Sequence, residues 1–207
     1  MIIHKIEAGI YAVNCYILAC EETKKACIID PGGDGERILK YIHDNHLIPQ
    51  FIILTHAHGD HIGGIPAIKE KIDLPIYLHE EDEELFADRK KNLSSMIGGA
   101  AIEMKPDKHL KDGDIISLGK LNLHIVHTPG HTKGGVSIHV ENVVFTGDTL
   151  FAGSIGRTDF EGGSFESIIE SIKSKLLKLD DQVKVLPGHG PSSTIGREKF
   201  YNPFLIN

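Results

Sequence analysis

Three histidines and one aspartate fall within six consecutive positions of the stretch THAHGDHIGG. The stretch follows the apolar run FIIL, which predicts a buried strand ending where these side chains begin. Imidazole with carboxylate suits zinc, iron or manganese, whereas a structural zinc site is typically rich in thiolates. The stretch therefore predicts a metal site at the end of a strand, with His56, His58, Asp60 and His61 as ligands.

Three further segments end, after an apolar run, in a coordinating residue beside glycine or proline. They are HTPGHT with His131, VVFTGDT with Asp148 and VLPGHG with His189. Glycine suits positions where the backbone turns sharply and comes close to a ligand. Any one of these histidines alone would more often be an ordinary loop residue. The combination of all these segments indicates a metal centre.

Seven candidate ligands are more than one tetrahedral ion can use. Two ions about 3.5–4 Å apart could use them all if one carboxylate bridged them. In an extended segment, residues 56, 58 and 60 would point to one side, and the turn into the following helix would bring His61 to join them. We predict two divalent ions, zinc first, with iron or manganese as alternatives.

The remaining histidines are interpreted as surface or hydrogen-bonded residues. They are His4, His43, His46, His79, His109, His124, His127 and His139. Of these, His127 lies three residues before the glycine of the PGH segment and could support a ligand from behind.

The surrounding pattern predicts the elements that must position these ligands. Apolar β-rich runs predict strands over 14–20, 25–30, 51–55, 75–79 and 183–187, and hairpins over 114–130 and 136–148. Helical spacing predicts helices after Asp34 as cap, through Ile65, Ile68 and Ile72, and over 164–179 after Ser164 as cap. Residues 80–112 have no clear assignment, because Gly98, Gly99 and Pro106 speak against one continuous helix.

Each half of the chain runs from strands through a helix to a further strand and a loop with a candidate ligand. Two such units would pack sheet against sheet with helices outside, which buries both faces of each sheet. We therefore predict an α/β fold, a four-layer αββα sandwich with two mixed sheets packed face to face. Residues 1–207 are expected to form this single domain.

The composition of the chain limits the kinds of partner that it is expected to bind. A net charge of −7 and a pI near 6.0 argue against nucleic acid as a partner. The chain has no apolar run approaching the ~20 residues of a membrane span. It shows no signal peptide, and Cys15, Cys20 and Cys27 lack a C-x-x-C spacing. We expect reduced, buried thiols, a cytoplasmic location and a small-molecule substrate, with the oligomeric state open.

The motifs THAHGDH, TPGHT, FTGDTLFAGSIGRTDF and PGHGP, in this order, resemble those of the metallo-β-lactamase superfamily. Within it they are most similar to short proteins of the glyoxalase II (hydroxyacylglutathione hydrolase-like) type. The resemblance implies one metal on His56, His58 and His131, and another on Asp60, His61 and His189. It implies Asp148 as the bridging ligand, with Asp60 and Asp148 as the catalytic carboxylates.

The chain departs from glyoxalase II at the substrate end. It ends too soon for the helical C-terminal domain that binds glutathione in that enzyme. Where the family has a lysine and a tyrosine that grip glutathione, this chain has the segment GRTDF. Arg157 could replace the lysine as a substrate-binding residue, but Asp159 stands near the position of the tyrosine.

The resemblance implies a thioesterase that cleaves an acyl-thiol, such as S-lactoylglutathione or a related conjugate, with a metal-bound hydroxide. A thiolate, whose conjugate acid has a pKa near 8.5, leaves without a general acid. An amide nitrogen would need a proton donor, so β-lactams are less suited. Three alternatives stay open: a mononuclear iron persulfide dioxygenase, a lactonase or other hydrolase of the superfamily, and a metal-binding protein without catalysis.

Overall fold

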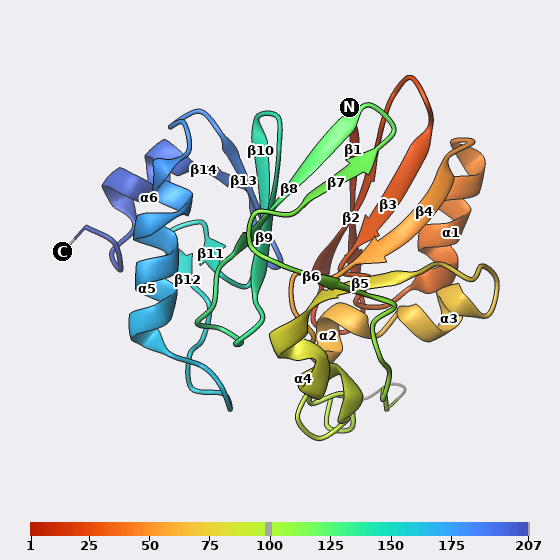
Figure 1. The fold of residues 1–207 in the computed structure, drawn as a ribbon, viewed down its shortest axis with the longest axis horizontal. Coiled ribbons are helices and arrows are strands. Elements are labelled where there is room, and N and C mark those ends of the chain that lie inside the picture. Colours follow the sequence, from red (N-terminus) through yellow and green to blue (C-terminus); the bar gives the residue numbers. More distant parts are fainter. Residues whose placement is uncertain (98–100, 207) are drawn as a thin grey trace.

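The structure is a computed structural model that describes residues 1–97 and 101–206, so Gly98 and Gly99 lie outside the described residues. Two sheets pack face to face, with helices on the outer face of each (Figure 1). The first sheet has the strand order β1-β2-β3-β4-β5-β6 and mixes antiparallel with parallel pairs. Its strands are β1 Ile2–Ala8, β2 Val13–Ala19, β3 Lys25–Ile29, β4 Ile48–Ile53, β5 Ile76–His79 and β6 Lys108–Leu110.

The second sheet has the order β14-β13-β10-β9-β8-β7 and is also mixed, because β10 pairs in parallel with β13 and antiparallel with β9. Its strands are β7 Ile115–Leu118, β8 Leu121–His127, β9 Val136–Val140, β10 Val143–Gly147, β13 Lys184–Pro187 and β14 Ser193–Thr194. A small hairpin lies between β10 and β13 in the sequence, formed by β11 Leu150–Phe151 and β12 Ser154–Ile155.

Helices cover both outer faces and also lie beside the loops at one end of the sheets (Figure 1). The helices before β6 are α1 Gly35–Asp44, α2 Gly59–Ile62, α3 Ile65–Lys69, the 3₁₀ turn η1 Glu80–Asp82 and α4 Glu83–Ala87. The later ones are α5 Phe165–Ser174, the 3₁₀ turn η2 Leu176–Lys178 and α6 Ile195–Tyr201. Among the described residues, we find no helix with the length and apolarity required for crossing a membrane.

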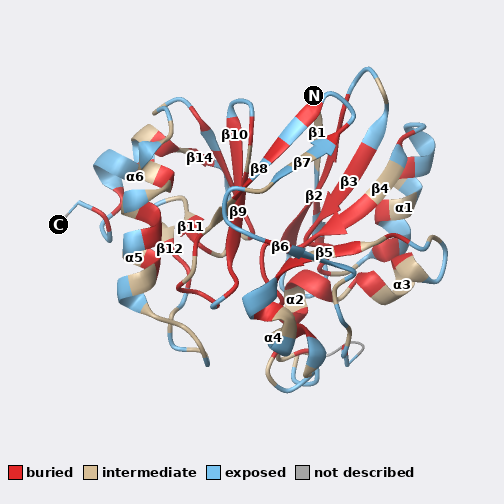
Figure 2. Ribbon diagram, in the orientation of Figure 1, coloured by how far each residue is buried: buried red, intermediate tan, exposed pale blue. Residues whose placement is uncertain are grey.

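Three apolar cores separate the four layers, and they explain why β2 is buried along its whole length. Ile17 faces the core under α1, whereas its neighbour Leu18 faces the core between the sheets. Val144 of β10 packs in the third core with Ile168 of α5. A strand covered on both faces gives a continuous apolar run instead of an alternating one. Figure 2 shows the resulting concentration of buried residues along both sheets. The predicted sandwich is confirmed.

The predicted caps and boundaries of the helices were confirmed at some positions and wrong at others. The Ser164 side chain caps α5 by accepting a hydrogen bond from the Ser167 N–H at 3.2 Å. Asp34 occupies the start of α1, but its backbone is left-handed (φ 51°) and its side chain accepts from the Gly9 N–H instead. The predicted helix over 164–179 breaks after Ser174 into η2, so the one-helix prediction was wrong there.

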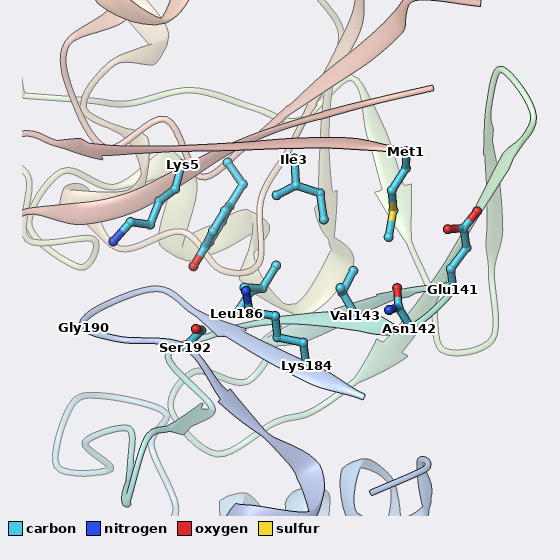
Figure 3. Close-up of a pocket in the computed structure, with 11 residues that line it drawn as sticks. Met1, Ile3, Lys5, Glu141, Asn142, Val143, Lys184, Leu186, Gly190 and Ser192 are labelled. Atoms are coloured by element: carbon cyan, nitrogen blue, oxygen red, sulfur yellow. The ribbon is translucent and has the colours of Figure 1, made fainter. Parts of the chain in front are cut away.

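One cavity lies away from the candidate ligands, at the edge where the two sheets separate (Figure 3). It measures about 540 Å³ and lies between Ile3 and Lys5 of β1 and Val143 and Leu186 of the second sheet. None of the predicted metal ligands lines it. This cavity is therefore separate from the cavity that the candidate ligands line.

Candidate metal centre

Strand direction brings the candidate ligands to one end of the molecule. Strands β8 and β10 both run antiparallel to β9, and β10 runs parallel to β13. The carboxyl ends of β8, β10 and β13 therefore point the same way, and His131, Asp148 and His189 follow them. The first sheet adds the loop after β4, which is tied across the sheets by the Val136 N–H donating to the Thr55 carbonyl at 2.8 Å.

Three histidines form one group of ligand atoms. His56, His58 and His131 are each at least 95% buried, and one ligand atom from each lies within 4.8 Å of the others. His58 Nδ1 and His131 Nε2 are 2.9 Å apart. Two ligand atoms on one tetrahedral zinc, each ~2.1 Å from the ion, lie roughly 3.4 Å apart. The spacing in this group suits a shared cation.

A second group is formed by Asp60, His61 and His189, again with ligand atoms within 4.8 Å of one another. His189 Nε2 lies 3.2 Å from Asp60 Oδ2, and His61 Nε2 lies 3.9 Å from the same oxygen. Asp60 and His61 stand in the first turn of α2, which begins at Gly59. The expectation of an extended segment through position 60 was therefore wrong: it ends at His58, and the helix presents Asp60 instead.

Asp148 lies between the two groups. Its Oδ1 is 3.3 Å from His61 Nε2, and its Oδ2 is 3.7 Å from both His131 Nε2 and His189 Nε2. One carboxylate thus faces both groups, as the bridging role requires. The structure brings all seven predicted residues together.

The buried polar atoms fit a cation. His56 Nε2, His61 Nε2 and Asp148 Oδ1 are buried and have no hydrogen-bond partner within residues 1–97 and 101–206. A buried polar atom without a partner costs free energy unless something satisfies it. Since these atoms face one another, a positive ion between them would satisfy them together.

The electrostatics keep the histidine group in its ligating form. Burial, followed by the repulsion that a protonated His131 would exert, lowers the pKa of His58 to about 3. Burial also lowers the pKa of His56 and of His131. All three rings are therefore neutral at pH 7, and a neutral imidazole offers a lone pair to a metal.

Asp60 of the second group and Asp148, which lies between the groups, are both held in the ionised form. Burial opposes the ionisation of Asp60 and Asp148, but the surrounding histidines, His61 foremost, together outweigh it and hold both carboxyl pKa values below their usual range. In return Asp148 and Asp60 raise the pKa of His61 against the effect of its burial. A metal ion would replace the proton on this ring, so binding there releases protons.

Two carboxylates that the sequence analysis did not single out hold this cluster in place. Asp30, directly after β3, faces His61 Nδ1 at 3.0 Å and accepts from the Thr55 N–H at 2.7 Å. Its position after an apolar strand and before Pro31-Gly32 was the signal that could have revealed it. Carboxylates behind ligating histidines fix ring orientation and tautomer.

Asp82 is the other such carboxylate and is 1% exposed. It accepts from the Ala57 N–H at 3.2 Å, the Thr132 hydroxyl at 2.8 Å and the Gly134 N–H at 2.7 Å. Ala57 lies between two of the candidate ligands and Thr132 follows a third, so Asp82 connects the two loops that carry these histidines. Its place in the unassigned stretch 80–112 gave no local signal.

His127 is not part of the cluster, contrary to the possibility that it supports a ligand. Its ring stacks on His79 at 4.0 Å and donates to the Lys133 carbonyl at 2.8 Å. The support of His131 comes instead from the Arg157 main chain, whose carbonyl lies 2.7 Å from His131 Nδ1.

The cluster opens into a cavity of about 640 Å³. Besides five of the candidate ligands, its lining residues are Tyr11, Leu93, Met96, Ile97, Phe151, Ser154, Ile155, Arg157 and Phe160. A pocket of this size with convergent polar groups is typical of a small-molecule site. Arg157 lies where the sequence predicted, but its guanidinium makes two bonds to Asp159, at 2.9 and 2.8 Å.

Comparison with known proteins decides the family. Residues 8–189 match the metallo-beta-lactamase superfamily. This chain belongs to that superfamily. Its ligand motifs and its αββα sandwich are thus those of a family member, as the resemblance implied.

Two curated relatives within the superfamily align over nearly the whole chain. The "Probable metallo-hydrolase YqgX" of Bacillus subtilis is 42% identical over 97% of this chain and 96% of its own length. The "Hydroxyacylglutathione hydrolase GloC" of Haemophilus influenzae is 38% identical over 99% of this chain and 98% of its own length.

Solved structures of the superfamily show the same fold. The BLEG-1 B3 metallo-beta-lactamase has a TM-score of 0.93 and 38% identity, with complete coverage of both chains. TTHA1623 in a di-iron-bound form has a TM-score of 0.87 and 35% identity, covering 98% of this chain and all of the other. ETHE1 from Myxococcus xanthus has a TM-score of 0.81 and 27% identity, covering 99% and 84%.

Proposed function

We propose that this chain is a metal-dependent hydrolase that cleaves acyl-thiols, a thioesterase of the glyoxalase II type. The observation that carries the proposal is the position of Asp148 between two groups of candidate ligands, in the lining of a cavity. The name of the GloC relative, a hydroxyacylglutathione hydrolase, supports the same activity. Residues 1–207 act as a single domain in this proposal.

The seven side chains would hold two divalent cations. His56, His58 and His131 would bind one, and Asp60, His61 and His189 the other, with Asp148 shared. Such a pair of ions acidifies water and polarises a carbonyl. The chain's own part is to keep three imidazoles neutral, keep two carboxylates ionised and exclude competing hydrogen bonds from the unpartnered nitrogens.

The ionised state of Asp60 favours a thioester over an amide. Because its pKa is held below the usual range, Asp60 is ionised at pH 7 and has no proton to donate. In thioester hydrolysis, a bond forms between the thioester carbonyl carbon and the oxygen of the attacking hydroxide. The C–S bond breaks, and the sulfur leaves as a thiolate with the electron pair of that bond. The thiol pKa near 8.5 makes that departure possible without an acid.

Zinc is the proposed metal, although the name of the TTHA1623 neighbour records a di-iron form and so makes iron the main competitor. The ETHE1 neighbour supports persulfide oxidation as the second candidate function. For that reaction one ion would suffice, and the Asp60, His61 and His189 group would be dispensable.

The test compares four activities on one preparation. Purified protein loaded with zinc, iron or manganese is assayed with S-lactoylglutathione and simple acyl-thiols, with a lactone, with a chromogenic cephalosporin and, for oxygen uptake, with glutathione persulfide. We expect thioester cleavage to exceed the other activities, with two ions per chain by elemental analysis. Oxygen uptake with one iron per chain, or cephalosporin or lactone turnover without thioester turnover, would overturn the proposal.

A further inference from the structure

The walls of the metal cavity are apolar beyond the candidate ligands. Leu93, Met96 and Ile97 contribute from the segment before residue 98, and Phe151, Ile155 and Phe160 from the segment that follows Asp148. Apart from the candidate ligands, Arg157 is the one charged side chain among the described residues that line the cavity. A substrate bound here would meet hydrocarbon on most sides.

The positive charge of Arg157 is already balanced by a neighbouring carboxylate, Asp159. Its Nε and Nη2 atoms bond to both carboxylate oxygens of Asp159, and its guanidinium lies 4.3 Å from the centre of the Phe160 ring. This two-point geometry is the strongest form of an arginine–carboxylate contact. A carboxylate on the substrate's carrier would have to displace Asp159 to gain the same bonds, so the pair offers it little net attraction.

Apolar side chains also remain exposed at this cavity. Met96 is 77% exposed and Tyr11 is 52% exposed, although both line it. Large exposed apolar groups beside a pocket often mark the surface that a ligand covers. Covering them requires a substrate with an apolar part of its own.

From these observations we infer the substrate class: thioesters with an apolar acyl chain on a carrier arm that bears no carboxylate close to the sulfur. This inference rests on the proposed thioester hydrolysis and concerns only which thioester is preferred. Glutathione thioesters, whose carrier has two carboxylates, would be poor substrates in comparison.

The first experiment uses the metal-loaded protein and three thioesters. They are hexanoyl and acetyl thioesters of N-acetylcysteamine, which are uncharged, and S-lactoylglutathione. We expect the order of kcat/KM to be hexanoyl, then acetyl, then S-lactoylglutathione. A preference for S-lactoylglutathione over both uncharged esters would overturn the inference but leave the proposed function intact. Hydrolysis of none of the three would instead reject the proposed function.

A variant tests the apolar wall. Met96→Ser should lower kcat/KM for the hexanoyl ester about three- to tenfold relative to the acetyl ester, because apolar contact area is lost. Ile115→Ser is the matched control, since Ile115 is also an exposed apolar residue (58%) but lies on β7 and does not line the cavity. Equal hexanoyl-to-acetyl ratios in wild type and Met96→Ser would contradict the assigned wall.

A second variant tests the neutralised arginine. Asp159→Asn removes the charge that occupies Arg157, so the KM for S-lactoylglutathione should fall about two- to fivefold, the range of exposed ion pairs. The acetyl ester should show no change. An unchanged KM for S-lactoylglutathione in Asp159→Asn would show that Asp159 does not block carboxylate binding, and this part of the inference would fail.

Discussion

The ring of His61 is held from behind by Asp30, whose Oδ2 lies 3.0 Å from His61 Nδ1. The other ring nitrogen, Nε2, faces Asp148 Oδ1 at 3.3 Å. A carboxylate on Nδ1 keeps the proton there and leaves the lone pair of Nε2 for a metal. Asp30 and His61 are 2% and 0% exposed, so water does not compete for this bond.

Asp30→Asn should weaken metal binding by the Asp60, His61 and His189 group. The asparagine amide can donate to Nδ1, which would move the ring proton to Nε2 and block that ligand atom. Loss of such a supporting contact typically costs 10–100-fold in metal affinity. Titration against a chelating dye should show one weakened site and one site of normal affinity. Two sites of wild-type affinity would contradict the role of Asp30.

Asp148→Ala should reduce the content of both metals together, because one carboxylate faces both ligand groups. We expect turnover to fall more than about hundredfold and elemental analysis to find less than one ion per chain. Asp73→Ala is the control, since the Asp73 side chain is 92% exposed and lies outside the cluster. Full metal loading with near-normal turnover in Asp148→Ala would exclude a bridging role.

Gly188→Ala should also abolish metal loading. A Cβ at this position would lie 2.4 Å from Asp148 Oδ1 and 2.6 Å from His61 Cε1. Those contacts are too close to keep, so the ligands must shift. Gly190→Ala in the same loop is the control: its Cβ meets open space, and its φ of +74° predicts a stability cost of about 1–2 kcal/mol without metal loss. Equal metal content in the two variants would reject this explanation.

The raised pKa of the buried Asp82 carboxyl predicts how the free energy of unfolding changes with pH. Burial raises its pKa to about 6, above the unfolded value near 3.8. The folded state therefore takes up a proton on Asp82 as the pH falls through 6. Its contribution to stability is fully present below about pH 4 and is lost as the pH rises through 6.

Asp82→Asn removes this titration and serves as the reference. The difference in unfolding free energy, wild type minus Asp82→Asn, should fall by about 2–3 kcal/mol between pH 4 and pH 7. Urea unfolding of both proteins in the same excess of chelator measures it, because the titration of the metal ligands cancels in the difference. A difference that does not change with pH would show that Asp82 is ionised throughout.

The sequence by itself predicted which side chains gather in the cluster of candidate ligands, and it predicted the four layers. His56, His131, Asp148 and His189 each follow an apolar strand and stand beside or near glycine or proline, and strands of this kind end together at one edge of a sheet. The burial of β2 on both faces appears in the sequence as an uninterrupted apolar run. These features are local, so a pattern of residue types is enough to predict them.

Only the tertiary structure decided which residues hold the candidate ligands in place and which side chains reach the cavity. Asp82 joins positions 57, 132 and 134, which are far from it along the chain, and no local pattern records such contacts. Asp34 satisfies every local rule for a helix cap, yet its carboxylate bonds to Gly9 because folding brings that distant N–H closer. Arg157 bonds to Asp159 in the folded loop, and this pairing, which depends on backbone geometry, removes the free charge that its position in the motif suggested.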